Sequence, residues 1–139
     1  MSYNVLLVDD SASLRKVVRK VLRLSGFKMN ECFEASNGRE ALQLLSDNWV
    51  DLILSDIHMP IMDGFQLLEA IRKDETWHDL PVVFITTESN PERLKKAVAL
   101  GARGYIRKPF KPEEIRSVLL RILGDSDDSV ATEDEGCDF

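Results

Sequence analysis

The sequence has few cysteines and no long hydrophobic run, and each shortage argues against a class of protein. Only two of the 139 residues are cysteines, Cys32 in an apolar-leaning segment and Cys137 in a polar one, so we expect no disulfide. No apolar run approaches the roughly 20 residues of a membrane-spanning helix. The opening MSYNVLLVDD has no basic region before its short apolar run, unlike a signal peptide. These features predict a cytoplasmic protein without membrane insertion.

Basic residues are missing from one region, residues 125–139. That region contains seven of the 24 acidic residues and none of the 18 basic ones. The net charge of −6 therefore arises there, because residues 1–124 hold 17 acids against 18 bases. Residues 125–139 also lack hydrophobic periodicity, and we expect an acidic, disordered C-terminal tail. Residues 1–124 form the one predicted domain.

Within residues 1–124, short aliphatic segments alternate with segments of helical periodicity. The clearest helical pattern places Leu14, Val17, Val18, Val21 and Leu22 at spacings of three and four residues. The expected strands are 4–8, 31–35, 51–55, 81–86 and 104–107, and the expected helices are 12–24, 38–46, 64–73, 91–100 and 112–123. This alternation predicts an α/β fold, a doubly wound parallel sheet with helices on both faces.

Glycine and proline mark several boundaries of the expected helices. Gly26 and Gly101 stand where a helix ends in a left-handed residue. Pro91 and Pro112 stand at a first helical position, where the missing N–H costs nothing. We expect Gly64 to have a positive φ in the loop before the 64–73 helix.

Polar side chains stand at the ends of four of the five expected strands. Asp9 and Asp10 follow the first strand, Asp56 follows the third, and Thr86 and Lys108 stand at the ends of the fourth and fifth. In open parallel sheets, sites form at this carboxyl edge. Singly, these residues have ordinary explanations, since Asp10 could cap a helix, Asp56 could begin a turn and Lys108 could be a solvated loop residue. Their convergence at one edge favours a site.

The chemistry of these side chains suits phosphoryl transfer. Carboxylates about 4 Å apart repel one another by on the order of 4 kcal/mol per pair at an effective dielectric near 20. Mg2+ removes such repulsion and prefers carboxylate, carbonyl and water oxygens. Lys108 adds a charge suited to a phosphoryl group, and the Thr86 hydroxyl can donate to an oxyanion. Together these parts favour moving a phosphoryl group onto or off one carboxylate.

Four blocks of sequence, LLVDDS, DLILSDIHMPIMDGF, PVVFITTES and GARGYIRKPF, resemble the receiver domains of two-component response regulators. The likeness covers about residues 3–123 and implies a flavodoxin-like (βα)5 fold with strand order 2-1-3-4-5. It also implies a phosphorylation-controlled switch that catalyses only its own phosphorylation and dephosphorylation.

The resemblance assigns roles to the residues at the sheet edge. Asp56 would accept the phosphoryl group, and Lys108 would bind a phosphoryl oxygen. Mg2+ would be coordinated by Asp10, Asp56 and the backbone carbonyl of His58, while Asp9 would act through a metal-bound water. The imidazole of His58 would then be free to line the mouth of the site. The peptide bond from Lys108 to the next residue, a proline, looks like the cis bond of the family.

Two further residues would transmit phosphorylation of Asp56 to the output surface. Thr86 would move towards the phosphate once it arrives, and Tyr105 would turn inward as Thr86 moves. The expected output surface joins the 91–100 helix, the 104–107 strand and the 112–123 helix, around Arg93, Lys96, Tyr105 and Arg107.

The expected partners are proteins. The resemblance implies a sensor histidine kinase or histidine phosphotransfer protein as phosphodonor, and a downstream target protein. No output domain is expected after residue 123, as in chemotaxis-type single-domain regulators. The 12–24 helix presents five bases, Arg15, Lys16, Arg19, Lys20 and Arg23, which form either a solvated face or a docking surface for the donor. Nucleic acid is not an expected partner, because residues 1–124 are close to neutral.

Two other functions use similar parts. Phosphatases of the haloacid dehalogenase type also combine an Asp nucleophile with Mg2+, but their nucleophile belongs to a D-x-D motif on the first strand, whereas Asp56 follows the third. A flavin or nucleotide binder of the same fold would need a phosphate-cradling loop after the first strand, where this sequence has DDSAS.

Overall fold

A five-stranded parallel sheet forms the centre of the computed structural model, which describes residues 2–123. The strands are β1 (Tyr3–Val8), β2 (Met29–Ala35), β3 (Leu52–Ser55), β4 (Val82–Thr86) and β5 (Gly104–Arg107), in the spatial order β2-β1-β3-β4-β5. This order confirms the α/β class and the flavodoxin-like topology expected from the sequence. The expected tail, residues 125–139, and Cys137 lie outside the described residues.

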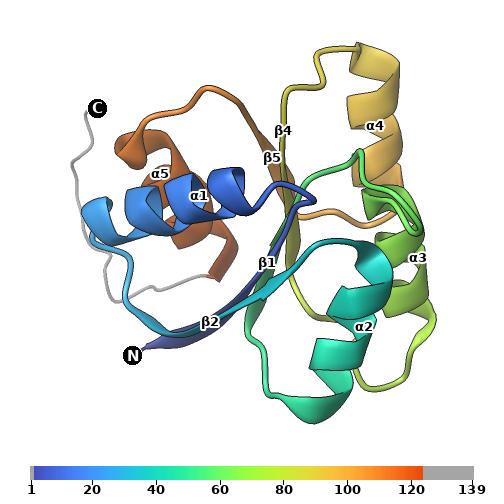
Figure 1. Cartoon of the computed structure of the whole chain (residues 1–139). Helices are drawn as coiled ribbons and strands as arrows, with labels where there is room; N and C mark the ends of the chain where they lie inside the picture. The colour runs from blue at the N-terminus through green and yellow to red at the C-terminus, as the bar shows by residue number, and fades with distance from the viewer. Residues whose placement is uncertain (1, 124–139) are drawn as a thin grey trace.

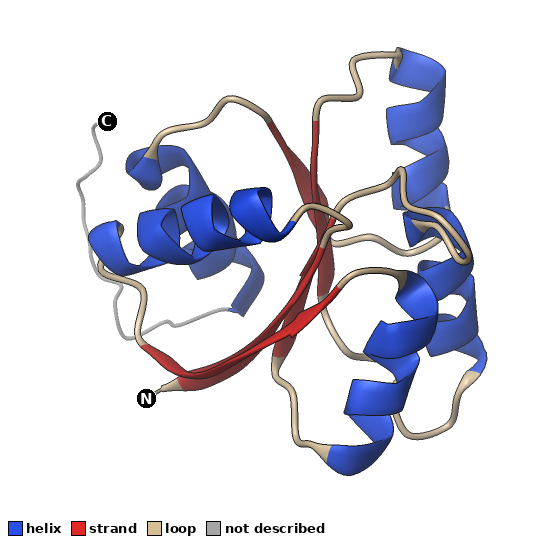
Figure 2. Cartoon of the chain, in the orientation of Figure 1, coloured by secondary structure: helices blue, strands red, loops and turns tan. Residues whose placement is uncertain are grey.

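Helices cover both faces of the sheet (Figures 1 and 2). They are α1 (Ala12–Leu24), α2 (Gly38–Asp47), α3 (Gly64–Lys73), α4 (Pro91–Ala99) and α5 (Pro112–Leu123). One hydrophobic core lies under α1 and α5, and a second lies under α2, α3 and α4. No helix within residues 2–123 is both long enough and apolar enough to cross a membrane.

The central strands contribute to both cores, because successive side chains point to opposite faces. In β1, Leu6 packs in the core under α2–α4 and Leu7 in the core under α1 and α5; Ile53 and Leu54 of β3 divide in the same way. Strand β2 lies at the edge of the sheet and begins at Met29, two residues earlier than expected from its apolar residues.

The helix ends follow the local chemistry of the sequence. Ser11 is the N-cap of α1, and its Oγ accepts a hydrogen bond from the N–H of Leu14 at 3.2 Å. Asp63 and Gln66 form a capping box at the start of α3. Gly26 and Gly101 have φ values of +84° and +108°, which confirms their expected left-handed conformation.

The expectation of a positive φ at Gly64 is wrong. Gly64 is the first residue of α3, and it is glycine because the neighbouring backbone leaves no room for a side chain. A Cβ atom there would lie 2.5 Å from the carbonyl oxygen of Asp56 and 2.9 Å from Cα of Ile57. The residue of this loop that does take a positive φ, +67°, is Ile61. The loop therefore runs close beneath Asp56 and turns at a β-branched residue.

Both tryptophans lie at the amino edge of the sheet, where the strands begin. Trp49 precedes β3 and is 76% exposed, and its Nε1 donates to the Asp51 carboxylate at 2.8 Å. Trp77 lies in the segment before β4 and packs against the core under α2–α4.

Candidate functional site

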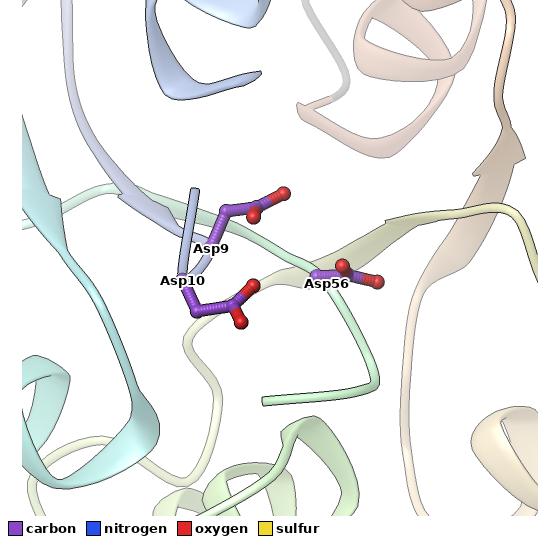
Figure 3. A group of neighbouring side chains, drawn as sticks. All are labelled: Asp9, Asp10 and Asp56. Atoms are coloured by element: carbon purple, nitrogen blue, oxygen red, sulfur yellow. The ribbon is translucent and has the colours of Figure 1, made fainter. Parts of the chain in front are cut away.

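Three carboxylates meet at the carboxyl edge of the sheet. Asp9 and Asp10 follow β1, and Asp56 follows β3; the two strands pair side by side with Val8 opposite Ser55. Each of the three offers a carboxylate oxygen, and these oxygens all lie within 4.8 Å of one another (Figure 3). Strand pairing thus brings together acids that are 46 or 47 residues apart in the sequence.

Lys108 lies between two of these carboxylates. Its Nζ donates to Asp9 Oδ2 at 3.2 Å and is 3.7 Å from Asp56 Oδ2. The lysine side chain is only 13% exposed. It reaches the acids from the end of β5, where its backbone N–H donates to the carbonyl of Thr86. The bond between Lys108 and Pro109 is cis, which confirms the expectation from the sequence.

The three carboxylates have different surroundings. Asp9 is buried, and its Oδ1 accepts from the N–H of Ser11 at 2.9 Å. Asp56 is partly buried, and its Oδ1 accepts from the N–H of Ile57 at 2.7 Å. Asp10 is exposed, and its carboxylate makes no hydrogen bond or ion pair with any side chain in residues 2–123. Because Ser11 caps α1, the ordinary explanation of Asp10 as a helix cap does not apply.

The oxygen donors fit a hard divalent cation. Neither carboxylate oxygen of Asp10 has a hydrogen-bond or ion-pair partner within residues 2–123. Asp56 directs one oxygen to a backbone N–H and the other towards Lys108. Mg2+ takes one or two carboxylates and keeps several waters, a need that an exposed and a half-buried acid can meet. His58 follows Asp56 by two residues in the loop before α3, at the position from which a backbone carbonyl was expected to complete the ligands.

Thr86 ends β4 and is fully buried. Its Oγ1 accepts a hydrogen bond from the N–H of Glu88 at 3.0 Å. A hydroxyl that accepts in this way still has its own proton to donate. The structure therefore shows Thr86 fastening the start of the β4–α4 loop, a contact that the sequence did not reveal.

Glu88 joins the two loops at the mouth of the site. Its Oε1 lies 3.0 Å from Nε2 of His58 and 3.1 Å from Nε of Arg93 on α4, and its Oε2 accepts from the N–H of Asn90 at 3.1 Å. The hydrogen bond from Asn90 and the contact with His58 lower the pKa of the Glu88 carboxyl. The imidazole of His58 was expected to be free, but it is exposed and bound to Glu88. No sequence spacing predicts this contact, since 30 residues separate the two.

The residues of the expected output surface divide into exposed and engaged side chains. Tyr105 lies on β5 opposite Phe84 and is 40% exposed, and Arg107 is also exposed. Arg93 and Lys96 on α4 both stand over the ring of Phe65, at 5.4 Å and 4.9 Å from its centre. Arg93 and Lys96 therefore pack on α3 in this structure, while Tyr105 and Arg107 of β5 are exposed.

Comparison with known proteins identifies a family and several relatives. The response regulator receiver domain family matches residues 5–120. A Porphyra purpurea protein named "Probable transcriptional regulator ycf29" is 40% identical over 123 residues, which are 88% of this chain and 57% of that protein. The chemotaxis protein CheY-3 of Vibrio cholerae is 39% identical over 119 residues, 86% of this chain and 90% of that protein. The chain thus spans little more than half of the first relative and nine-tenths of the second.

Solved structures resemble the fold along most of its length. The chemotaxis response regulator CheY4 of Vibrio cholerae superposes with a TM-score of 0.77 at 38% identity, covering 88% of this chain and 99% of that one. The receiver domain of a sensor histidine kinase from Pseudomonas aeruginosa has the same TM-score at 26% identity, covering 90% and 100%. That structure has a magnesium ion coordinated in its active-site cleft.

Proposed function

This chain belongs to the response regulator receiver domain family, and we propose that it is a phosphorelay switch whose phosphoacceptor is Asp56. The observation that carries the proposal is the meeting of Asp9, Asp10 and Asp56 at one edge, with Lys108 between Asp9 and Asp56. Membership of this family favours such a switch over the phosphatase and nucleotide-binding alternatives. Receiver domains act as signalling switches, and the chain's own phosphorylation and dephosphorylation are the only reactions we propose for it.

The metal of this site is proposed to be Mg2+. Asp10 and Asp56 would supply carboxylate oxygens, the backbone of His58 a carbonyl oxygen, and Asp9 a contact through a bound water. When bound, Mg2+ supplies positive charge that offsets the carboxylates and the oxygens of the incoming phosphoryl group. The resemblance to a receiver domain with magnesium in its cleft supports this assignment.

The transfer step needs one nucleophile and a positioned cation. An oxygen of the Asp56 carboxylate forms a bond to phosphorus while the bond from phosphorus to the donor's leaving group breaks. The leaving group departs with the bonding electrons, and Asp56 becomes an acyl phosphate. Dephosphorylation is the hydrolysis of this acyl phosphate. Water attacks phosphorus, the bond from phosphorus to Asp56 breaks, and the products are the free carboxylate and inorganic phosphate.

Lys108 would hold a phosphoryl oxygen of this intermediate. Its ammonium group is now 3.2 Å from Asp9 and 3.7 Å from Asp56, so it already stands on the side of Asp56 where negative charge would grow. A partly buried cation there offsets this charge more strongly than a solvated one.

Phosphorylation would be read through Thr86 and the β4–α4 loop. The Thr86 hydroxyl would donate to a phosphoryl oxygen and give up its bond from the N–H of Glu88. The loop would then rearrange, Tyr105 would turn inward, and the α4–β5–α5 surface would change its affinity for a target. The outward exposure of Tyr105 in this structure is consistent with the unphosphorylated state.

The proposed partners are a histidine kinase or histidine phosphotransfer protein as donor and a downstream target protein. We propose that the protein acts in the cytoplasm and does not bind nucleic acid. The likeness to CheY-3 over 90% of that protein favours a chemotaxis-type regulator. Residues 1–124 are proposed as the receiver domain and residues 125–139 as an acidic tail.

Labelling with a small acyl phosphate tests the function. The chain should take up about one phosphoryl group per molecule in the presence of Mg2+, and chelation of the metal should abolish labelling. Asp56→Asn should lose the label, because an amide is not a nucleophile for phosphorus. Phosphate-affinity electrophoresis and intact mass measure the yield.

Asp63→Asn is the matched control, since it makes the same change seven residues away and asparagine caps a helix as well as aspartate does. It should label like the parent. Labelling of Asp56→Asn at the parent's level would refute Asp56 as the acceptor, and catalytic turnover of a generic phosphate ester would instead indicate a phosphatase.

A further inference from the structure

Helix α1 carries an unbalanced positive charge. It contains five bases and no acid, Arg15, Lys16, Arg19, Lys20 and Arg23. Arg15 and Arg19 form ion pairs with Glu34 at 2.8 Å and 3.1 Å. The other three side chains are exposed and form no ion pair with residues 2–123. Glu34 thus pairs with two of the five cations, and the other three have no ion-pair partner in the described residues.

A hollow of about 340 Å3 opens beside the second half of α1. Arg19 and Arg23 line it from the helix, and Phe27, Met29 and Cys32 line it from the turn and β2. The guanidinium group of Arg19 donates to Glu34 and to the carbonyl of Cys32, but its Nε is buried without a hydrogen-bond partner in the described part of the chain. The hollow therefore has a mainly polar lining that includes two guanidinium groups, and Asn30 and Glu31 also contribute to it.

We propose that residues 125–139 of the same chain bind this face of α1 and its hollow, and so cover both. Charge complementarity supports this segment as the occupant. The segment has seven acids and no base, and the helix has three exposed bases without an ion-pair partner in the described residues. The exposed bases of α1 and this hollow together form one surface, the α1 cradle.

The connection is short enough for binding within one molecule. Helices α1 and α5 cover the same face of the sheet (Figure 1), and both run antiparallel to the strands, so their last turns lie at the same edge. Sixteen residues follow Leu123, which ends α5. Extended, they reach about 50 Å, whereas α1 is about 20 Å long. The tether thus brings the acids to the α1 cradle at high effective concentration.

The consequence for signalling rests on the proposed function. Arg15 on α1 donates to the backbone carbonyl of Asp9, so the first turn of α1 borders the acidic site. A segment bound along α1 would obstruct a protein donor that approaches Asp56 over this helix. It would leave a small acyl phosphate free to enter.

Amide chemical shifts of the full chain test the contact itself. The parent is compared with a full-length variant in which all seven acids of residues 125–139 are changed to their amides. The expected shift differences lie in α1, the following turn and β2, with none in α2, α3 or α4. They should shrink in about 0.5 M salt, where the Debye length is well below 10 Å.

Disulfide trapping gives a second readout, because one of the two cysteines lines the hollow and the other lies in the segment. Burial raises the pKa of the Cys32 thiol, so mild oxidation is done at alkaline pH, where the thiolate forms. The Cys32–Cys137 bond should form within the monomer. In Lys16→Gln/Lys20→Gln, which leaves Arg23 in place because that cation lowers the pKa of the Cys32 thiol, the bond should form at least about fivefold more slowly, because the attraction is electrostatic.

The matched control removes two exposed bases from the opposite face, Lys73→Gln/Lys95→Gln, and should trap at the parent's rate. Equal trapping in the α1 variant and the parent, or shift differences confined to other elements, would overturn the proposal. Disulfide-linked dimers with concentration-dependent shifts would overturn it in favour of binding to a second copy. Labelling by a small acyl phosphate should be the same in the parent and the amide variant, so loss of the α1 contact and loss of phosphoacceptor function are told apart.

Discussion

Ile61 has a backbone conformation that β-branched residues rarely adopt. Its φ is +67°, and its side chain is 74% exposed. A left-handed conformation costs an L-residue about 1–2 kcal/mol, and an exposed side chain recovers little of this by burial. The loop that carries Asp56 towards α3 therefore contains local strain at one residue.

Replacing Ile61 should relieve this strain. Asparagine tolerates the left-handed region, so Ile61→Asn should raise the free energy of unfolding by about 1 kcal/mol. Ile61→Val is the control, because valine keeps the branched Cβ and should change stability by less than about 0.5 kcal/mol. Urea denaturation measures both. A less stable Ile61→Asn would mean that the exposed side chain makes a contact worth more than the strain.

At the scale of elements, Glu88 connects the β3–α3 loop, the β4–α4 loop and helix α4. Its carboxylate contacts His58, Arg93 and the N–H of Asn90, while its own N–H is held by Thr86. The pKa of this carboxyl is lower in the folded chain than its ordinary value of 4.5. The contacts therefore contribute fully above about pH 4.5 and are lost as the pH falls through the lowered folded-state value.

Removing the Glu88 carboxylate should loosen the start of α4. In Glu88→Ala, amide hydrogen exchange should become faster from residue 88 to residue 93, because one acceptor and the link to His58 disappear. Glu92→Ala removes an exposed acid from the first turn of α4 without touching His58, and should leave exchange at residue 88 unchanged. Unaltered exchange in Glu88→Ala would show that the bond from Glu88 N–H to Thr86 holds the loop alone.

Features that depend on residues close together in the sequence were predictable, and features that depend on contacts across the fold were not. The helix starts at Pro91 and Pro112 and the left-handed conformation of Gly26 depend on residues within one turn, and they were predictable. The role of Gly64 was not, because its space is limited by the backbone of Asp56 from another turn of the chain. The start of β2 at Met29 escaped notice since an edge strand lacks a continuous apolar pattern. Local chemistry predicted the elements, but contacts across the fold did not follow from it.

The candidate site divides in the same way. The acids and Lys108 were expected together because parallel strands share one carboxyl edge, a rule that needs only strand order. Which neighbours each acid would bind was not predictable, since the distances from Lys108 depend on side-chain packing across three strands. The roles assigned to Asp56, Thr86 and Tyr105 stay predictions until labelling and exchange are measured.

On the scale of the whole molecule, three carboxylates cluster around one cation, Lys108, which contacts Asp9 and Asp56 and leaves Asp10 without a cationic partner in the described residues. Like charges this close raise the free energy of the native state. A ligand that binds only the native state adds RT ln(1 + [L]/Kd) to the free energy of unfolding, about 2.7 kcal/mol at a hundredfold excess over Kd. Mg2+ should therefore raise the melting temperature of the parent in a concentration-dependent way.

Asp10→Asn separates these two effects. It removes one charge from the cluster at an exposed position, so it should melt above the parent without Mg2+ and respond less to the metal. Asp47→Asn, at the end of α2 and away from the site, should keep the parent's full response. An equal Mg2+ response in Asp10→Asn and the parent would remove Asp10 from the proposed ligands.

The placement of the tryptophans has an optical consequence. Trp49 and Trp77 both lie where strands begin, so the indole emission of residues 2–123 comes from the edge opposite to the carboxylates. An ion or a phosphoryl group arriving at Asp56 stands a full strand length away from either fluorophore. Tryptophan emission should therefore change when the chain unfolds and change little when Asp56 is phosphorylated. Phosphorylation must be followed with a probe placed at the edge that carries the carboxylates.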